Sequence, residues 1–169
     1  MRSVEIREYS VADLEVCRDL WRDLTQRHRD IYEDPSIGGA DPGPAFDEYL
    51  GHAHFTNLYL AVRDGEVIGM CGLLVDGEEA ELEPIVVRPT RRNSGVGARL
   101  AQRVIAEART LGMKYINVRP VGRNIEAIAF FNREGFRLLG RLELSLQLDA
   151  DAFPAPRKQT ALHGVEFDY

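Results

Sequence analysis

The segment Glu83-Pro-Ile-Val-Val-Arg-Pro-Thr-Arg-Arg-Asn-Ser-Gly-Val-Gly-Ala-Arg-Leu100 decides how this chain folds. Its apolar first part predicts a strand, and the residues around Gly95 and Gly97 predict a short loop that runs directly into a helix. Small residues let the backbone approach a ligand closely. The unpaired N–H groups of a helix's first turn, together with the helix dipole, favour an anion there. With Arg91 and Arg92 beside it, the segment predicts a phosphate or pyrophosphate site.

Two other nucleotide-binding motifs do not match this segment. A P-loop requires the pattern GxxxxGK[ST], which the chain lacks. A dinucleotide fingerprint GxGxxG would begin at Gly95, but Leu100 stands where its third glycine is required, and the preceding strand resembles the end of an antiparallel meander. By itself, the segment is equally compatible with an ordinary glycine-containing helix start flanked by solvated arginines. Its meaning therefore depends on the rest of the chain.

The order of elements around this segment predicts a mixed sheet. Upstream, the apolar spacing indicates a strand at 4–8, a helix at 11–31, a loop at 35–44, a short helix at 45–51 and strands at 58–63, 67–75 and 79–87. Downstream, it indicates a helix at 95–111, a strand at 115–118, a helix from Asn124 to Gly135, and strands at 142–148 and 165–167. Asp64-Gly65 and Asp76-Gly77 predict tight hairpins, since both turn positions need positive φ. The expected fold is α/β, with a central, mostly antiparallel mixed sheet flanked by helices.

Length and composition indicate one globular domain. The 169 residues suffice for a single core, and we place one domain at 1–149 and a C-terminal tail at 150–169. The net charge of −6 argues against a nucleic-acid partner. No apolar run has the length of a signal peptide or a membrane span, so we expect a cytoplasmic protein with no membrane partner. Cys17 and Cys71 lie in apolar patterns and the four histidines are scattered, so we expect buried cysteines and no metal.

Two motifs together resemble the GNAT superfamily of N-acetyltransferases. The first follows the family pattern V-x-P-x-x-R-x-x-G-x-G and consists here of Val87, Pro89, Arg92, Gly95 and Gly97. The second lies about thirty residues later in NIEAIAFFNREGF and consists of Asn124, Ala127, Phe130, Gly135 and Phe136. The motifs have the family's order and separation and follow the expected meander. The resemblance covers residues 56–140 well, the N-terminal strand and helix loosely, and the tail not at all.

The resemblance implies acetyl-CoA as the acyl donor and assigns residues to it. The coenzyme A pyrophosphate would be wrapped by the backbone of Arg92, Asn93, Ser94, Gly95, Val96, Gly97 and Ala98. The pantetheine arm would pair with the backbone of Ile85, Val86 and Val87. Asn124 would hydrogen-bond that arm from the other side, Ala127 and Phe131 would line the site, and Arg133 would reach the nucleotide phosphates.

The residues of the chemical step are less completely matched. Glu81 and Glu83 alternate with Leu82 on the strand that leads to the loop, and a Glu on this strand acts as the base in related enzymes; two solvated carboxylates are the alternative. In other members the base is instead a Glu on the following strand, where this chain has Asn117, which cannot accept a proton. Phe131 replaces the Tyr that usually protonates the leaving thiolate. Tyr115 is the nearest other phenol, but a strand start favours a core position for it.

The resemblance predicts an enzyme that transfers the acetyl group of acetyl-CoA to a primary amine by direct attack in a ternary complex. The alternative is a non-catalytic acyl-CoA-binding sensor or assembly module, which the residues at 117 and 131 favour. We expect a small-molecule or peptide acceptor to contact the helix at 11–31, the loop at 35–44 and the tail. Acidic residues there favour a cationic acceptor: Glu33, Asp34, Asp41, Asp47 and Glu48. An exposed strand edge at the C-terminus is compatible with a homodimer.

Overall fold

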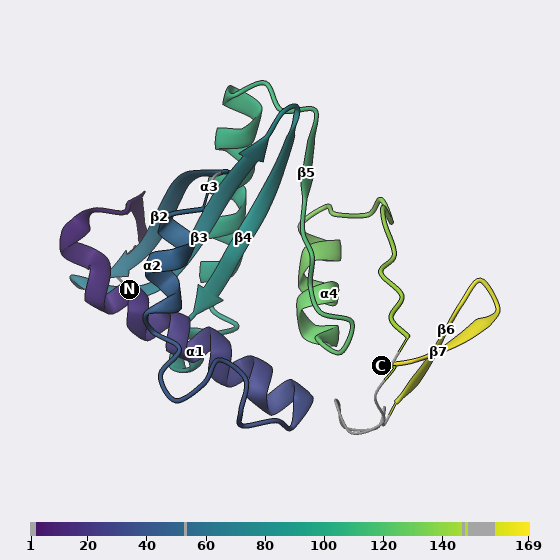
Figure 1. Ribbon diagram of the computed structural model, residues 1–169. Coiled ribbons are helices and arrows are strands. Elements are labelled where there is room, and N and C mark those ends of the chain that lie inside the picture. The colour runs from purple at the N-terminus through teal and green to yellow at the C-terminus, as the bar shows by residue number, and fades with distance from the viewer. Residues whose placement is uncertain (1–2, 53, 147, 149–157) are drawn as a thin grey trace. The chain divides into compact units, whose positions relative to one another are not determined.

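The computed structural model describes residues 3–52, 54–146, 148 and 158–169 (Figure 1). The chain divides into two compact units, Met1–Arg119 and Pro120–Tyr169, and each is described by itself. The single domain predicted at 1–149 and the tail boundary stay predictions. Residue 149 and residues 150–157, the first part of the predicted tail, lie outside the described residues.

The first unit is built on a mixed sheet, as the sequence predicts, and this sheet has five strands. Its strands follow the spatial order β1 (Glu5–Glu8), β2 (Phe55–Arg63), β3 (Glu66–Asp76), β4 (Glu79–Val87) and β5 (Tyr115–Asn117). The first four are antiparallel neighbours and β5 runs parallel to β4. The sheet is therefore a meander extended by one crossover strand, because a parallel neighbour needs the intervening helix to return to the same edge.

The two hairpin turns differ in type. Asp64 and Gly65 both adopt positive φ (53° and 81°), which matches the predicted two-residue turn. In the second hairpin, only Gly77 has positive φ (60°), and the two residues between the strands are Gly77 and Glu78. The prediction that both Asp76 and Gly77 would adopt positive φ was wrong, because the turn begins one residue later, at Gly77. A glycine at the first central position suits a turn type that needs positive φ at that position alone.

Helices cover the two faces of the sheet (Figure 1). A 3₁₀ turn at Val11–Asp13 leads into α1 (Leu14–Tyr32), and α2 (Ala45–Leu50) follows the loop. The core beneath these two helices contains Cys17, Leu20, Phe46, Tyr49, Leu58, Leu60, Met70 and Val86. Tyr59, between Leu58 and Leu60, points to the opposite face of the sheet, because side chains alternate along a strand. There it packs against Arg103 of α3 (Val96–Thr110), whose guanidinium lies 4.3 Å from the Tyr59 ring centre.

The second unit contains α4 (Ile125–Arg133) and a hairpin of β6 (Gln159–Leu162) and β7 (Val165–Asp168). β7 confirms the strand expected at 165–167, and β6 was not predicted. The strand predicted at 142–148 is wrong for its described residues, which form no strand at 142–146 and 148. Leu142, Leu144, Leu146 and Leu148 do alternate, but all four are exposed. Alternation indicates a strand only where a neighbouring strand supplies hydrogen bonds. Among the described residues, no helix is both long enough and apolar enough to cross a membrane.

Candidate active site

The loop after β4 has the backbone geometry that an anion site requires. It passes through a 3₁₀ turn at Pro89–Arg91 and reaches α3 at Gly95, the residue just before the helix. Asn93 and Gly95 adopt positive φ (57° and 79°). The Ser94 hydroxyl donates a 2.6 Å hydrogen bond to the carbonyl oxygen of Arg91. The loop is thus held by its own backbone and side chains, while residues 91–95 are exposed.

The first turn of α3 leaves donors available beside this loop. The Arg99 N–H bonds to the Gly95 carbonyl oxygen at 3.2 Å, so the N–H groups of Val96, Gly97 and Ala98 precede the first intrahelical bond. A Cβ placed on Gly95 would meet no atom within 4 Å. Open space, free donors and the positive end of the helix dipole fit a phosphate group at this position.

β4 has an open edge directly before the loop. β5 pairs with β4 only from Glu79 to Glu81, and no described strand pairs with residues 83–87 on that side. Ile85 and Val87 are half-buried there, and Val86 is buried on the α1 face. An extended ligand with amide groups can pair with such an edge as another strand would. This is the property that the sequence resemblance assigns to residues 85–87.

β4 also carries a bulge in its middle. β3 and β4 pair at Cys71↔Ile85 and again at Leu73↔Leu82. Between these pairs, Glu83 and Pro84 lie opposite Gly72 alone, which is the two-against-one arrangement of a bulge. The bulge interrupts the strict alternation that would place Glu81 and Glu83 on one face.

The two candidate bases have different surroundings. The Glu81 side chain is 15% exposed and forms an ion pair with Arg119, just beyond β5. Glu83 is exposed. The Asn117 side-chain amide donates a 3.1 Å hydrogen bond to a Glu79 carboxylate oxygen. Sequence reasoning missed Arg119, because pairing across a parallel strand depends on a register that the sequence does not display.

The second predicted motif lies on α4, in the second unit. The Asn124 side-chain oxygen accepts a 3.1 Å hydrogen bond from the Ala127 N–H and so caps the helix, as its position predicts. Phe131 is buried, with ring centres 5.1 Å from Phe130 and 5.5 Å from Phe136. Arg133 lies in the last turn of α4. The roles of these residues toward coenzyme A stay predictions.

Comparison with known proteins agrees with this geometry. The model of the acetyltransferase (GNAT) family matches residues 15–136, which is more than half of the chain. The chain belongs to the GNAT acetyltransferase family. It is therefore an acyltransferase, as the two motifs predict.

Individual relatives of this acetyltransferase are distant. An "IAA acetyltransferase" of Azospirillum brasilense is 30% identical over 79 residues, which are 46% of this chain and 52% of the relative, so the match spans about half the length of that curated protein. A GNAT-family acetyltransferase of Staphylococcus aureus is 20% identical with a TM-score of 0.68, over 85% of this chain and 90% of that one. AAC(6')-Iy, in complex with the bisubstrate analogue CoA-S-monomethyl-acetylneamine, is 21% identical with a TM-score of 0.64, over 86% and 99%. At these identities, the structural matches show the shared fold.

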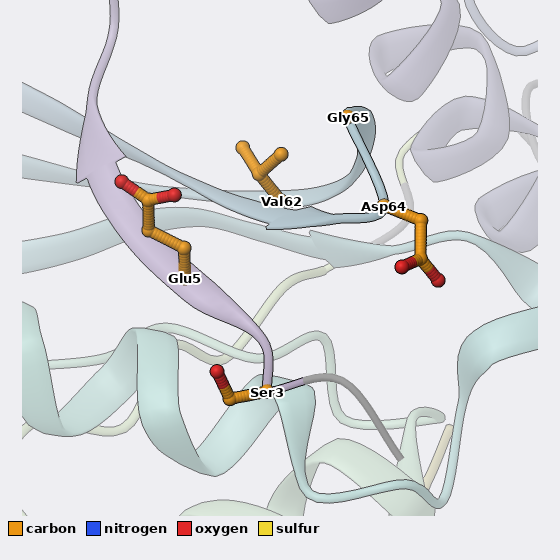
Figure 2. Close-up of a pocket in the computed structure, with 5 residues that line it drawn as sticks. All are labelled: Ser3, Glu5, Val62, Asp64 and Gly65. Atoms are coloured by element: carbon orange, nitrogen blue, oxygen red, sulfur yellow. The ribbon is translucent and has the colours of Figure 1, made fainter.

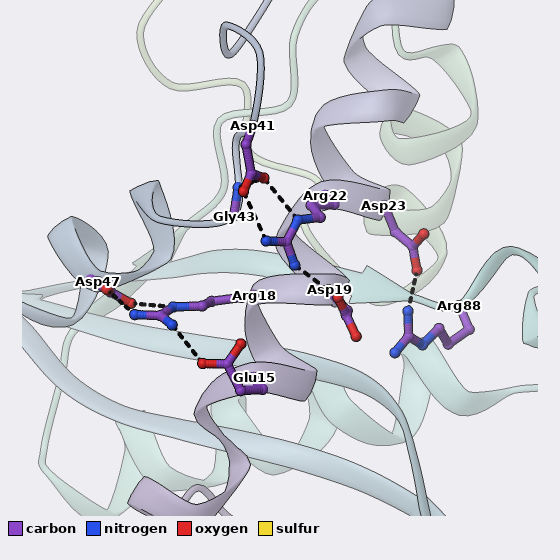
Figure 3. A network of polar contacts seen from close by, with 9 residues as sticks. All are labelled: Glu15, Arg18, Asp19, Arg22, Asp23, Asp41, Gly43, Asp47 and Arg88. Atoms are coloured by element: carbon purple, nitrogen blue, oxygen red, sulfur yellow. Dashed lines mark hydrogen bonds and ion pairs between the residues drawn. The ribbon is translucent and has the colours of Figure 1, made fainter.

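Several acidic residues of the acetyltransferase that were predicted to attract an acceptor are engaged within the protein (Figure 3). Arg18 binds Asp47 of α2 with two hydrogen bonds. Arg22, one turn later on α1, binds Asp41 at 2.8 Å and 3.0 Å. Asp34 accepts hydrogen bonds from the backbone N–H and the hydroxyl of Ser36. Asp41 and Asp47 thereby hold the loop and α2 against α1. Carboxylates already engaged in this way give little support to the prediction of a cationic acceptor.

Predictions from the sequence of this acetyltransferase also concern the two cysteines, Tyr115 and metal binding. Cys17 and Cys71 are buried, as predicted, and burial raises the pKa of both thiols, that of Cys17 to about 12. Tyr115 is exposed, so its predicted core position was wrong; it lies on the short outermost strand of the sheet. Among the described residues, no group of three His, Cys, Asp or Glu side chains is arranged to hold a metal.

An open depression lies beside the turn between β2 and β3 (Figure 2). It is lined by Ser3, Glu5, Val62, Asp64 and Gly65. The lining contains two carboxylates and no basic side chain, so it does not suit the phosphates of coenzyme A. None of the predicted site residues lines it.

Proposed function

We propose that this protein transfers the acetyl group of acetyl-CoA to a primary amine by direct attack in a ternary complex. The observation that carries the proposal is the open edge of β4 at residues 83–87, which leads through the loop at 88–95 to the donor-rich first turn of α3. An extended arm that ends in a pyrophosphate matches both parts at once. AAC(6')-Iy, which shares the fold, has been crystallised with CoA and with a CoA-based bisubstrate analogue, which supports the donor.

The chemistry places simple demands on the protein. An ammonium group first gives one proton to the base, because only the neutral amine attacks. The amine nitrogen then forms a bond to the thioester carbonyl carbon, the carbon–sulfur bond breaks with its electron pair on sulfur, and the nitrogen loses a second proton to the thiolate or to water. A lysine-like amine has a pKa of about 10.4, so a base helps at neutral pH. The leaving thiol has a pKa of about 8.5, so it can depart as a thiolate without an acid at residue 131.

We assign the base role to Glu83 in preference to Glu81. The Arg119 guanidinium engages the Glu81 carboxylate in an ion pair, which would have to break before that carboxylate could contact an amine. Glu83 is exposed beside the open edge of β4. Glu83→Gln should lower kcat by about 10²- to 10⁴-fold with coenzyme A affinity kept, and the loss should shrink at high pH, where the amine is already neutral.

Glu81→Gln is the matched comparison, because it changes the same group two residues away. A larger loss for Glu81→Gln than for Glu83→Gln would reverse the assignment. Two variants with wild-type rates would mean that neither carboxylate accepts the proton.

A screen of primary amines and peptides tests the function itself. Thiol released from acetyl-CoA is measured with each acceptor, and the acetylated product is confirmed by mass. We expect at least one amine to give turnover well above hydrolysis. A protein that binds coenzyme A yet acetylates no amine would contradict the proposal and favour the non-catalytic acyl-CoA-binding module.

A further inference from the structure

The carbonyl group of Glu83 has an unusual hydrogen-bond partner. In the β4 bulge, Glu83 and Pro84 share the single opposing residue Gly72, so the regular ladder is interrupted there. The Tyr49 hydroxyl, which comes from α2, donates a 2.6 Å hydrogen bond to the Glu83 carbonyl oxygen. A side chain from a helix thus replaces a strand as the donor at this point of the sheet.

The site that receives the hydroxyl is shaped for it. A Cβ on Gly72 would collide with both the Tyr49 hydroxyl oxygen and the Glu83 carbonyl oxygen, so only glycine leaves room for this bond. Tyr49 is 8% exposed. Burial raises the pKa of its hydroxyl, which therefore stays protonated and able to donate.

The Tyr49 ring is held from three sides. Its centre lies 5.5 Å from that of Trp21 of α1, 6.1 Å from that of Phe46 and 5.6 Å from that of Phe55 at the start of β2. Such ring pairs add to the stabilisation from burial alone. The hydroxyl is consequently presented by a rigid group, and its direction depends on α1, α2 and β2 together.

We propose that Tyr49 is a positioning residue that fixes the β4 bulge and thereby aims the Glu83 carboxylate. The carbonyl belongs to Glu83 itself, so its direction sets the backbone angle ψ of that residue and the path of the side chain relative to the open edge. This inference rests on the proposed function, in which Glu83 is the base. It ties the sheet's catalytic strand to α2, the helix that follows the loop predicted to contact the acceptor.

A double-mutant cycle tests the link between the two residues. Tyr49→Phe should lower kcat by about 10- to 100-fold, the range expected for a misplaced group, with coenzyme A affinity kept. Because Tyr49 acts through Glu83, Tyr49→Phe combined with Glu83→Gln should be no slower than Glu83→Gln alone. Losses that multiply, or a wild-type rate for Tyr49→Phe, would overturn the proposal. A slow Tyr49→Phe variant combined with a wild-type rate for Glu83→Gln would also overturn the proposal, because Tyr49 would then act through another group.

Tyr9→Phe is the matched control. Tyr9 packs on Phe46 in the same aromatic cluster, with ring centres 6.1 Å apart, and it also loses one hydroxyl in the variant. If the loss of any hydroxyl in this aromatic cluster slowed the enzyme by loosening the core, both variants would be slow. The proposal expects only Tyr49→Phe to be slow.

Amide hydrogen exchange gives a readout that needs no turnover and so separates this proposal from the proposed function. Tyr49→Phe should speed exchange at the amides of Gly72, Leu73 and Ile85 by at least about tenfold, and Tyr9→Phe should not. Unchanged exchange in Tyr49→Phe would overturn the positioning role even in an active enzyme. Faster exchange in a protein that acetylates no amine would leave the bulge contact standing and count against the proposed function alone.

Discussion

At the scale of single residues, Phe131 is the clearest departure from the family pattern. The matching position usually carries a phenol that protonates the leaving sulfur, whereas Phe131 is a buried ring between Phe130 and Phe136. If Phe131 lines the coenzyme A site as the family pattern implies, phenylalanine keeps the ring at this position and removes the donor. Under the proposed function, coenzyme A would then leave as a thiolate or take a proton through water.

We expect Phe131→Tyr to keep coenzyme A affinity and to raise kcat, because it restores a proton donor to a site already shaped for the ring. A hydroxyl without a partner would cost about 1–3 kcal/mol of stability, so the melting temperature is measured on the same preparation. Phe130→Tyr adds the same hydroxyl one residue away and serves as the control. A large fall in kcat for Phe131→Tyr, with stability and affinity unchanged, would show that Phe131 has a role that a phenol cannot share.

Asp13 shows how one residue connects two elements. Its carboxylate accepts hydrogen bonds of 2.7 Å and 2.8 Å from the Arg7 guanidinium on β1 and others from the Ser10 backbone and side chain. The Arg7 hydrogen bonds are the main cause that holds the pKa of Asp13 well below its usual value, against the opposing effect of burial. The pair fastens the start of α1 to the edge of the sheet.

Asp13→Asn should lower the free energy of unfolding at pH 7 by about 1–3 kcal/mol, since it leaves a partly buried guanidinium without its partner. A depressed folded-state pKa stabilises the protein fully above the unfolded value of about 3.9, and this contribution is lost as the pH falls toward the folded value. The difference between wild type and variant should therefore shrink below about pH 4 in urea titrations.

Asp41→Asn is the control for this pH dependence. Hydrogen bonds from Arg22 lower the pKa of Asp41 to about 2, but that pair is exposed and solvent screens it. Its variant should change stability much less. An Asp13→Asn variant whose destabilisation stays constant down to pH 2 would contradict the linkage argument.

At the scale of elements, the join between β4 and α3 carries the cofactor prediction. Gly95→Asp should abolish the rise in melting temperature that coenzyme A causes, because it places an anion in the open space before the first turn of the helix. Asp at this position also strains a backbone with φ of 79°. Gly112→Asp controls for that strain, since Gly112 has φ of 75° with open space around it, directly after α3. A preserved coenzyme A shift in Gly95→Asp would remove the phosphate assignment.

The elements that the sequence predicted well are those determined by neighbouring residues. The start of α3 directly after Gly95 and the turn at Asp64-Gly65 follow from backbone preferences that act over two or three residues. Apart from the turn at Asp76-Gly77, which is displaced by one residue, the predictions that failed depended on distant partners. The leucines at 142–148 alternate as a strand would, yet a strand exists only with a hydrogen-bonding neighbour. In the same way, the bulge opposite Gly72 and the pairing of Arg119 with Glu81 depend on register between strands, which no local pattern encodes.

At the scale of the whole molecule, a net charge of −6 should repel the phosphates of coenzyme A, yet the predicted site carries Arg91 and Arg92. Which effect prevails depends on distance. Ionic screening limits the reach of exposed charges to about 10 Å at 0.1 M salt, so the local arginines should outweigh the overall charge. We therefore expect coenzyme A affinity to fall as salt is raised from low to high concentration.

Two variants with the same net charge separate the local effect from the global one. Arg92→Gln and Arg109→Gln each add one unit to the negative charge, but Arg109 lies in the last turn of α3, about 20 Å along the helix from its first turn. Arg92→Gln should weaken coenzyme A binding several-fold and flatten its salt dependence, whereas Arg109→Gln should match wild type in titration calorimetry at each salt concentration. Equal weakening in both variants, or wild-type affinity that rises with salt, would mean that the charge of the whole molecule governs binding and that the arginines of the loop do not.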